Sequence, residues 1–186
     1  PHYLVRRENA VAYSPSSSRP SIEGLPQIFW ADYAPWREAN LWAVERATTG
    51  DASLKTVASN MNGLLNYAKF LESRDLQWFE FPARKADRCL VLYRGALIKM
   101  RDAGQISPST ASEYMRNCIM FYRWVRHREL LSPHVQLWRE KPYVVKYFDR
   151  VGFERTISGT TTDLSIPNRK RPGQTLEDGL LPVSET

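Results

Sequence analysis

Cysteine and histidine are scarce in this chain of 186 residues, and their scarcity removes several kinds of site. The two cysteines, Cys89 and Cys118, each fall on the apolar side of an expected helix, so we interpret them as small core residues in a reducing compartment. The histidines, His2, His127 and His134, are scattered and lack a partner at the spacing of metal ligands. We therefore expect no metal site and no cofactor.

Long apolar stretches are also lacking. No run approaches the roughly 20 residues that a helix needs to cross a bilayer, and no signal-peptide pattern opens the chain. Clustered acids and bases of the kind that an independent enzyme uses are not evident either. We therefore expect no catalytic residues, no membrane partner and no small-molecule substrate.

The chain does contain enough apolar material for a packed core, together with an excess of positive charge. Hydrophobic residues make up 42% of it and aromatic residues 12%, which excludes a wholly disordered chain. The net charge is +6, and most of it lies in the stretch 51–131, which holds 13 Lys and Arg against 8 Asp and Glu. A positive field in this part of the chain favours an acidic polymer as partner.

The clearest helix signal lies between Ile106 and Pro133. Ser107 has the side chain of an N-cap, Pro108 suits the first helical position, and Pro133 disfavours helix in the residue before it. Apolar residues recur between these ends at steps of three and four, which predicts one buried side. They are Ala111, Tyr114, Met115, Cys118, Phe121, Tyr122 and Val125. The other side carries Ser109, Ser112, Glu113, Arg116, Arg123 and His127.

Three further helices are predicted before this one, at Pro35–Thr48, Ser53–Arg74 and Arg84–Ala103. Each has an apolar side, and Gly50 and Gly104 follow the first and the third as natural C-terminal caps. The sequence therefore predicts an all-α fold, a bundle of about four to five helices.

The two ends of the chain differ from this helical part. Residues 1–26 begin with apolar side chains and continue into a Ser/Pro-rich run, which predicts an irregular leader. Tyr143–Phe148 is rich in β-formers, and Phe153–Ile157 can pair with it across a turn at Asp149–Gly152, which predicts a short β-hairpin. The basic, turn-rich segment around residues 169–171 is typical of a linker.

Several motifs recur in an order that points to a known family. The last helix has an S-P-S-T start, an F-Y-R-W centre and an L-L-S-P close, and N-Y-A-K-F-L forms the centre of the second. These features resemble the core-binding domain of tyrosine recombinases, the phage-integrase family, over about Asp51 to Pro133. Near the end, L-L-P-V-S-E at residues 180–185 resembles the entry into the catalytic domain of that family.

The resemblance implies a core-binding domain of the SAM-like type, which is an orthogonal bundle that lays helix faces against duplex DNA. It implies a leader and first helix at 1–50, the core-binding domain at 51–135, and a hairpin and linker at 136–186 leading to an absent catalytic domain. The tyrosine nucleophile and the Arg/Lys/His cluster of the family belong to that catalytic domain. This chain has no H-x-x-R motif, so the expectation is a DNA-binding fragment without chemistry of its own.

The resemblance also implies the biological setting. The partner is double-stranded DNA at the recombination or attachment sites of a mobile element, during integration or excision. The full-length recombinase is expected to assemble as a tetramer on DNA. The expected location is cytoplasmic, associated with the nucleoid of a bacterium or with a phage.

The positions that match DNA-facing surfaces of the family lie at helix starts and on polar helix faces. Phosphate contacts are expected from Lys55, Arg116 and Arg123, and phosphate or base-edge contacts from the hydroxyls and Asn62. The complete predicted set is Lys55, Thr56, Ser59, Asn62, Ser109, Thr110, Ser112, Arg116, Arg123, Arg169, Lys170 and Arg171.

Other interpretations of these residues stay open. Helix capping explains Ser109 and Thr110 equally well, and a merely solvated linker explains residues 169–171. Glu113 would repel phosphate unless it pairs with Arg116 or accepts a hydrogen bond from cytosine. These alternatives predict different surroundings for the same side chains.

Two other functions fit the same sequence. A stand-alone helical DNA-binding regulator would explain the basic helices, although the compact turn of a helix-turn-helix is not evident. A protein-interaction or oligomerisation bundle would use the Trp- and Phe-rich loop around residues 78–82 and the helix Pro35–Thr48 as its contact surface.

Overall fold

A computed structural model describes residues 2–7, 10–15, 22–50, 52–148 and 152–168. The described residues form four α-helices: α1 (Arg37–Thr48), α2 (Leu54–Ser73), α3 (Cys89–Asp102) and α4 (Pro108–His127). A short 3₁₀ helix, η1 (Lys85–Asp87), precedes α3. The strands are β1 (His2–Arg7), β2 (Ala10–Pro15), β3 (Glu140–Phe148) and β4 (Glu154–Thr162). The prediction of a largely helical bundle is confirmed, and none of these helices is both long and apolar enough to span a bilayer.

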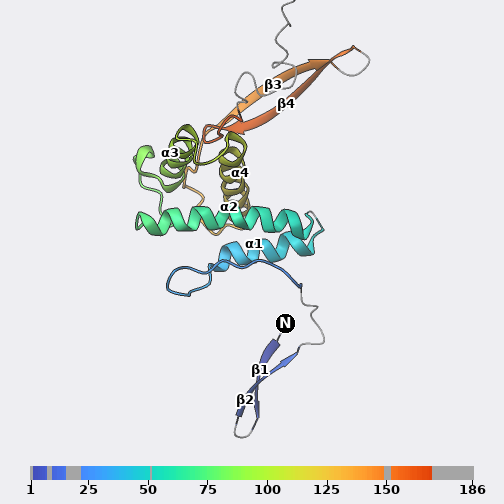
Figure 1. Ribbon diagram of the computed structural model, residues 1–186, viewed down its shortest axis with the longest axis vertical. Coiled ribbons are helices and arrows are strands. Elements are labelled where there is room, and N and C mark those ends of the chain that lie inside the picture. Colours follow the sequence, from blue (N-terminus) through green and yellow to red (C-terminus); the bar gives the residue numbers. More distant parts are fainter. Residues whose placement is uncertain (1, 8–9, 16–21, 51, 149–151, 169–186) are drawn as a thin grey trace, which may run out of the picture.

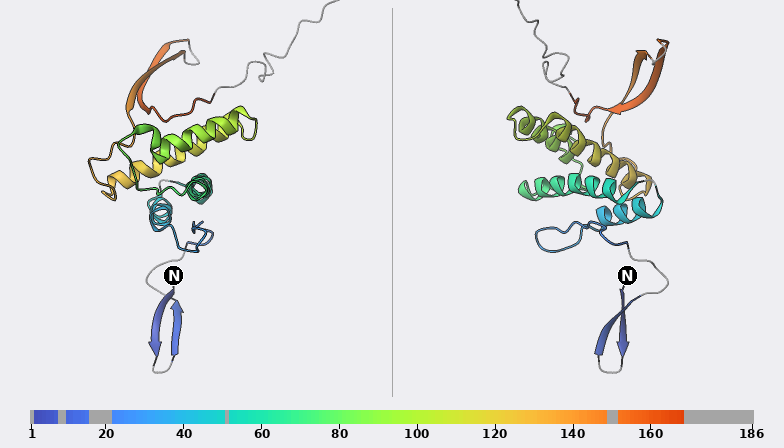
Figure 2. Two further views of the ribbon diagram at one scale, coloured as in Figure 1. Left: turned by 90° about the vertical axis from the view of Figure 1, so that its left-hand side faces the viewer. Right: turned by 45° about the vertical axis from the view of Figure 1, so that its right-hand side comes forward.

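The helices form two crossed layers. Figures 1 and 2 show α1 beside α2, with α3 and α4 lying across them. Helix α2 packs against the other three helices, and α1 also reaches α4. The β3–β4 hairpin projects from the α3–α4 layer on the side away from α1 (Figure 1).

The core is centred on aromatic rings. Trp36, just before α1, is 1% exposed, and its ring centroid lies 4.8 Å from that of Trp30, 5.3 Å from Phe121 and 6.2 Å from Trp78. These four side chains come from the segment before α1, from the α2–η1 loop and from α4. The segment around α1 is therefore packed on the bundle, a point that the sequence left open.

The predicted N-cap of α4 is confirmed, and α2 has a cap of the same kind. Ser53 Oγ accepts a hydrogen bond from the Thr56 backbone N–H at 3.2 Å, and Ser107 Oγ accepts from the Thr110 N–H at 3.0 Å. Pro108 occupies the first turn of α4 as expected. Six of the seven predicted apolar positions of α4 are buried, and Tyr114 is half-buried.

Two predicted helix boundaries were wrong. Helix α4 ends at His127, well before Pro133, because Glu129 takes a positive φ of 55° and the Leu130 N–H donates to the Val125 carbonyl, which closes the helix. The predicted helix from Arg84 is divided into η1 and α3 by Arg88. The backbone of Arg88 is extended, and the Arg88 guanidinium donates to the carbonyls of Pro82, Ala83 and Gln136.

The expected irregular leader is also corrected. Residues 2–15 contain a two-stranded antiparallel hairpin in which His2 pairs with Pro15 and Arg7 with Ala10. The β-forming residues of both arms carried a signal for it, but the Ser/Pro-rich composition that follows dominated the prediction.

The β-hairpin predicted after the helices is confirmed, and its strands are longer than predicted. Strand β3 pairs antiparallel with β4, from Glu140 opposite Thr162 to Phe148 opposite Glu154. Its predicted turn at 149–152 lies outside the described residues except for Gly152, which has a φ of 88°. The additional pairs at the base bring Thr160 and its neighbours into β4.

Candidate nucleic-acid interface

A cavity of about 250 Å³ separates the polar face of α4 from the base of the β3–β4 hairpin. Three predicted DNA-contacting residues line it from α4: Ser112, Arg116 and Arg123. Steps of four and seven residues place them on one side of a helix, so periodicity alone explains why they share this wall. Tyr143 of β3 and Thr160 of β4 are among the residues of the opposite wall.

The cavity has the charge of an anion site. Two arginines and no carboxylate are found among the described residues that line it. The nearest acidic contact is Glu140, whose Oε1 lies 3.7 Å from Arg123 Nη2, with both side chains 49% exposed. An ion pair that long and that exposed holds its arginine weakly, so Arg123 can exchange Glu140 for an incoming anion.

Ser109 and Thr110 are occupied in capping α4. The Ser107 hydroxyl lies 2.8 Å from the hydroxyl of Ser109 and 2.8 Å from that of Thr110, besides accepting from the Thr110 N–H. The capping interpretation of both residues therefore has a structural basis. A DNA contact through either hydroxyl stays a prediction.

The predicted residues of α2 form a separate set. Lys55, Thr56, Ser59 and Asn62 are all exposed, and none of the four lines the α4–hairpin cavity. The Thr56 hydroxyl lies 3.0 Å from the capping hydroxyl of Ser53. The predicted residues 169–171 lie outside the described part of the chain.

Glu113 does not have the partner that the sequence offered for it. Within the described residues no ion pair joins Glu113 to Arg116, and Glu113 does not line the cavity. Within the described residues the Glu113 carboxylate therefore forms no ion pair with either arginine of the wall.

The hairpin wall is the part of the candidate site that the sequence did not predict. Tyr143 pairs across the strands with Gly159, and its ring covers that glycine so closely that an added Cβ would lie 2.7 Å from the Tyr143 hydroxyl. The run Gly159 to Thr162 was visible in the sequence, but its proximity to α4 depends on how the hairpin is anchored.

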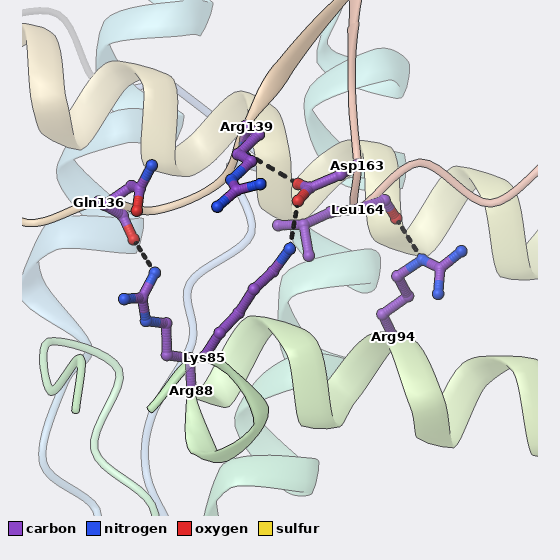
Figure 3. A network of polar contacts seen from close by, with 7 residues as sticks. All are labelled: Lys85, Arg88, Arg94, Gln136, Arg139, Asp163 and Leu164. Carbon is purple, nitrogen blue, oxygen red and sulfur yellow. Dashed lines mark hydrogen bonds and ion pairs between the residues drawn. The ribbon is translucent and has the colours of Figure 1, made fainter. Parts of the chain in front are cut away.

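A polar network anchors the base of the hairpin to η1 and α3 (Figure 3). The Asp163 carboxylate accepts from Lys85 Nζ at 2.5 Å and from the Arg139 backbone N–H at 3.1 Å. Arg94 Nε donates to the Leu164 carbonyl at 3.1 Å. The flanking side chains of Leu137, Trp138, Leu164 and Ile166 are buried in the core. Contacts just before β3 and just after β4 therefore hold the base of the hairpin, and with it Thr160, opposite α4.

The ionisation of Asp163 is linked to this anchor. Burial alone would raise the pKa of its carboxyl, but the hydrogen bonds from Lys85 and from the Arg139 N–H outweigh it, and the net pKa lies below the ordinary value of 3.8. A lowered folded-state pKa contributes stability that is present above the unfolded pKa and is lost as the pH falls through the folded pKa.

We expect Asp163→Asn to lower the free energy of unfolding by about 1–2 kcal/mol at pH 7, the scale of one hydrogen bond to a charged group. The difference from the unsubstituted chain should begin to shrink as the pH falls below the unfolded-state pKa of about 3.9, and should be lost once the pH has also passed the lower folded-state pKa of Asp163. Urea unfolding at pH 7 and pH 3 measures both values. Asp102→Asn is the control, since Asp102 is exposed and pairs with its sequence neighbour Arg101 and not with the hairpin. Equal losses in the two variants would contradict the anchor.

The buried hydroxyl and thiol groups of the core have a structural role. The Tyr122 hydroxyl donates to the Trp78 carbonyl and lies 2.9 Å from the Tyr67 hydroxyl. Burial raises the pKa values of Tyr67, Tyr122 and Cys118, so all three stay protonated at neutral pH. Such groups are poor nucleophiles.

A larger cavity, about 860 Å³, lies beside the α3–α4 connection. Its arginines already have partners: Arg94 donates to Leu164, and Arg101 pairs with Asp102 at 2.9 Å. A carboxylate also lines it. The α4–hairpin cavity is therefore the better candidate for an anionic ligand.

Comparisons with protein-family models, with curated proteins and with solved structures found no match for this chain.

Proposed function

We propose that this chain is the DNA-binding, N-terminal portion of an integrase-type tyrosine recombinase, with an orthogonal core-binding bundle that grips duplex DNA at the attachment sites of a mobile element. The observation that carries the proposal is the α4 wall. Ser112, Arg116 and Arg123, selected from sequence motifs and polarity, line one side of a cationic cavity.

The electrostatics of this wall suit a DNA backbone. Arginine presents a planar fork of N–H donors that matches phosphate oxygens. Arg116 and Arg123 are exposed and lie two helical turns apart on the same side of α4, so they can approach neighbouring parts of a backbone. Phosphate contacts of this kind position a protein without specifying sequence, which fits binding of modest specificity.

The test compares three single variants that each remove one positive charge. Arg116→Gln and Arg123→Gln should each weaken binding to a fluorescent random-sequence duplex by about threefold to tenfold at low salt, and should reduce the salt slope of log K by about 1. Arg37→Gln, on exposed α1 at the other side of the bundle, is the control and should leave both values unchanged. Fluorescence anisotropy across a salt series measures them.

Two results would count against the proposal. One is the absence of duplex binding by the unsubstituted chain even at low salt. The other is an equal loss in Arg37→Gln, which would show that net charge alone governs binding.

A protein-interaction surface is the second candidate function, favoured by exposed apolar side chains around α1. Phe29 is 53% exposed and Leu41 55%, and Val44 lies on the same helix as Leu41. Trp78, which the sequence placed on this surface, is instead buried, with its carbonyl bonded to Tyr122. The α1 side of the bundle lies opposite the β3–β4 hairpin (Figure 1), so self-association and DNA binding can coexist.

A further inference from the structure

The hairpin side of the α4–hairpin cavity is lined by residues that carry hydroxyl groups. Tyr143, Thr160 and Thr161 from the two strands and Ser165 just beyond β4 all line it. The Thr161 and Ser165 hydroxyls lie 2.8 Å apart, so this part of the wall is internally hydrogen-bonded. Hydroxyls of Ser, Thr and Tyr are the usual neutral partners of phosphate oxygens, alongside arginine.

The floor of the cavity is apolar and well packed. Ile119 of α4 is 6% exposed and Ile166 is 3% exposed. These two side chains bring no negative charge that would oppose an anion beside the guanidinium groups. Since Glu140 lies outside the lining and its 3.7 Å ion pair with Arg123 is long and exposed, the cavity keeps a positive potential.

The volume sets the size of the ligand. About 250 Å³ corresponds to roughly eight water volumes of about 30 Å³ each. That space exceeds a single inorganic oxyanion and accommodates a phosphodiester with its neighbouring sugar atoms. The two walls come from α4 and from the hairpin, so a bound phosphate would contact both elements at once.

We propose that this cavity is a phosphate-binding clamp, in which Arg116 and Arg123 of α4 supply the charge and the Thr160 hydroxyl of the hairpin supplies an opposing hydrogen bond. The assignment of its natural ligand as a phosphodiester of duplex DNA rests on the proposed function; the affinity for the phosphate group itself does not. The hairpin is thereby a second DNA-contacting element, joined to α4 by the ligand.

The first arm of the test uses inorganic phosphate alone. Titrating phosphate against chloride at matched ionic strength into the ¹⁵N-labelled 186-residue chain should shift the amide signals of Ser112, Arg116 and Thr160. Arg116→Gln and Thr160→Val should each weaken this binding, about fivefold for the loss of the charge-assisted bond and less for the hydroxyl. Thr156→Val is the matched control, because Thr156 is exposed on the same strand and points to the same face of the hairpin, nearer its tip.

The second arm measures duplex binding of the same variants. Weaker duplex binding in Thr160→Val than in Thr156→Val supports the clamp with DNA as its ligand. Phosphate shifts without any duplex binding would support the clamp and overturn the proposed function. Duplex binding that is equal in Thr160→Val and Thr156→Val, with no phosphate shifts at the cavity, would overturn the clamp and leave the proposed function intact.

Discussion

Replacing Trp36 with alanine is expected to lower the free energy of unfolding by about 3–5 kcal/mol. The side chain is 1% exposed and contacts aromatic rings from three separate parts of the chain. Removing it takes away the transfer free energy of a large apolar group and leaves a cavity that the surrounding rings cannot close. Because small proteins are stable by only about 5–15 kcal/mol, the variant should unfold at far lower urea concentration.

The control for Trp36→Ala lies three residues away. Tyr33 is 87% exposed, so Tyr33→Ala should change the free energy of unfolding by less than about 0.5 kcal/mol. Urea unfolding followed by circular dichroism measures both variants. Similar small effects at both positions would contradict the packing of the α1 segment on the bundle.

The second large effect is expected at Gly63, where α2 and α4 touch. A Cβ at this position would lie 2.4 Å from Asn117 Nδ2 and 3.0 Å from Asn117 Cβ. Asn117 cannot easily move away, because it is buried and accepts a hydrogen bond from Asn60 Nδ2 at 2.9 Å. Gly63→Ala should therefore cost about 1–3 kcal/mol of overpacking, partly offset by up to about 1 kcal/mol of better helix propensity.

Gly95 of α3 provides a control with the opposite sign. A Cβ there meets no atom within 4 Å, so Gly95→Ala should stabilise the chain by about 0.5–1 kcal/mol through helix propensity alone. Thermal unfolding of the two variants in parallel gives the contrast. A stabilising Gly63→Ala would show that α2 and α4 do not approach as closely as the Gly63–Asn117 contact requires.

The sequence predicted the features that depend on neighbouring residues. The cap at Ser107 and the buried side of α4 follow from local chemistry and from periodicity, and each was found where expected. The end of α4 was missed because the positive φ of Glu129 closes the helix earlier than the proline signal indicated. Likewise, the close approach of Gly63 to Asn117 could not be predicted, because it depends on how two separate helices, α2 and α4, pack together.

In the candidate site, too, the part set by neighbouring residues could be predicted and the part set by distant contacts could not. The α4 wall could be predicted because Ser112, Arg116 and Arg123 belong to one helix. The hairpin wall could not, since it depends on contacts such as the one between Lys85 and Asp163, which are 78 residues apart. A two-stranded hairpin is marginally stable alone, so its position follows from the tertiary anchors and not from strand propensity.

The most direct test of the central claim is to locate DNA on the surface of the protein. Cys89 and Cys118 are buried, so a cysteine-specific photo-crosslinker should label a new surface cysteine selectively. We would place it by Glu113→Cys on α4, beside the cavity, and by Leu41→Cys on exposed α1, and irradiate each with a random-sequence duplex at low salt. If the α4 side of the bundle binds DNA, crosslinking should be strong from position 113 and weak from position 41. Equal yields, or a higher yield from position 41, would contradict DNA binding by this side.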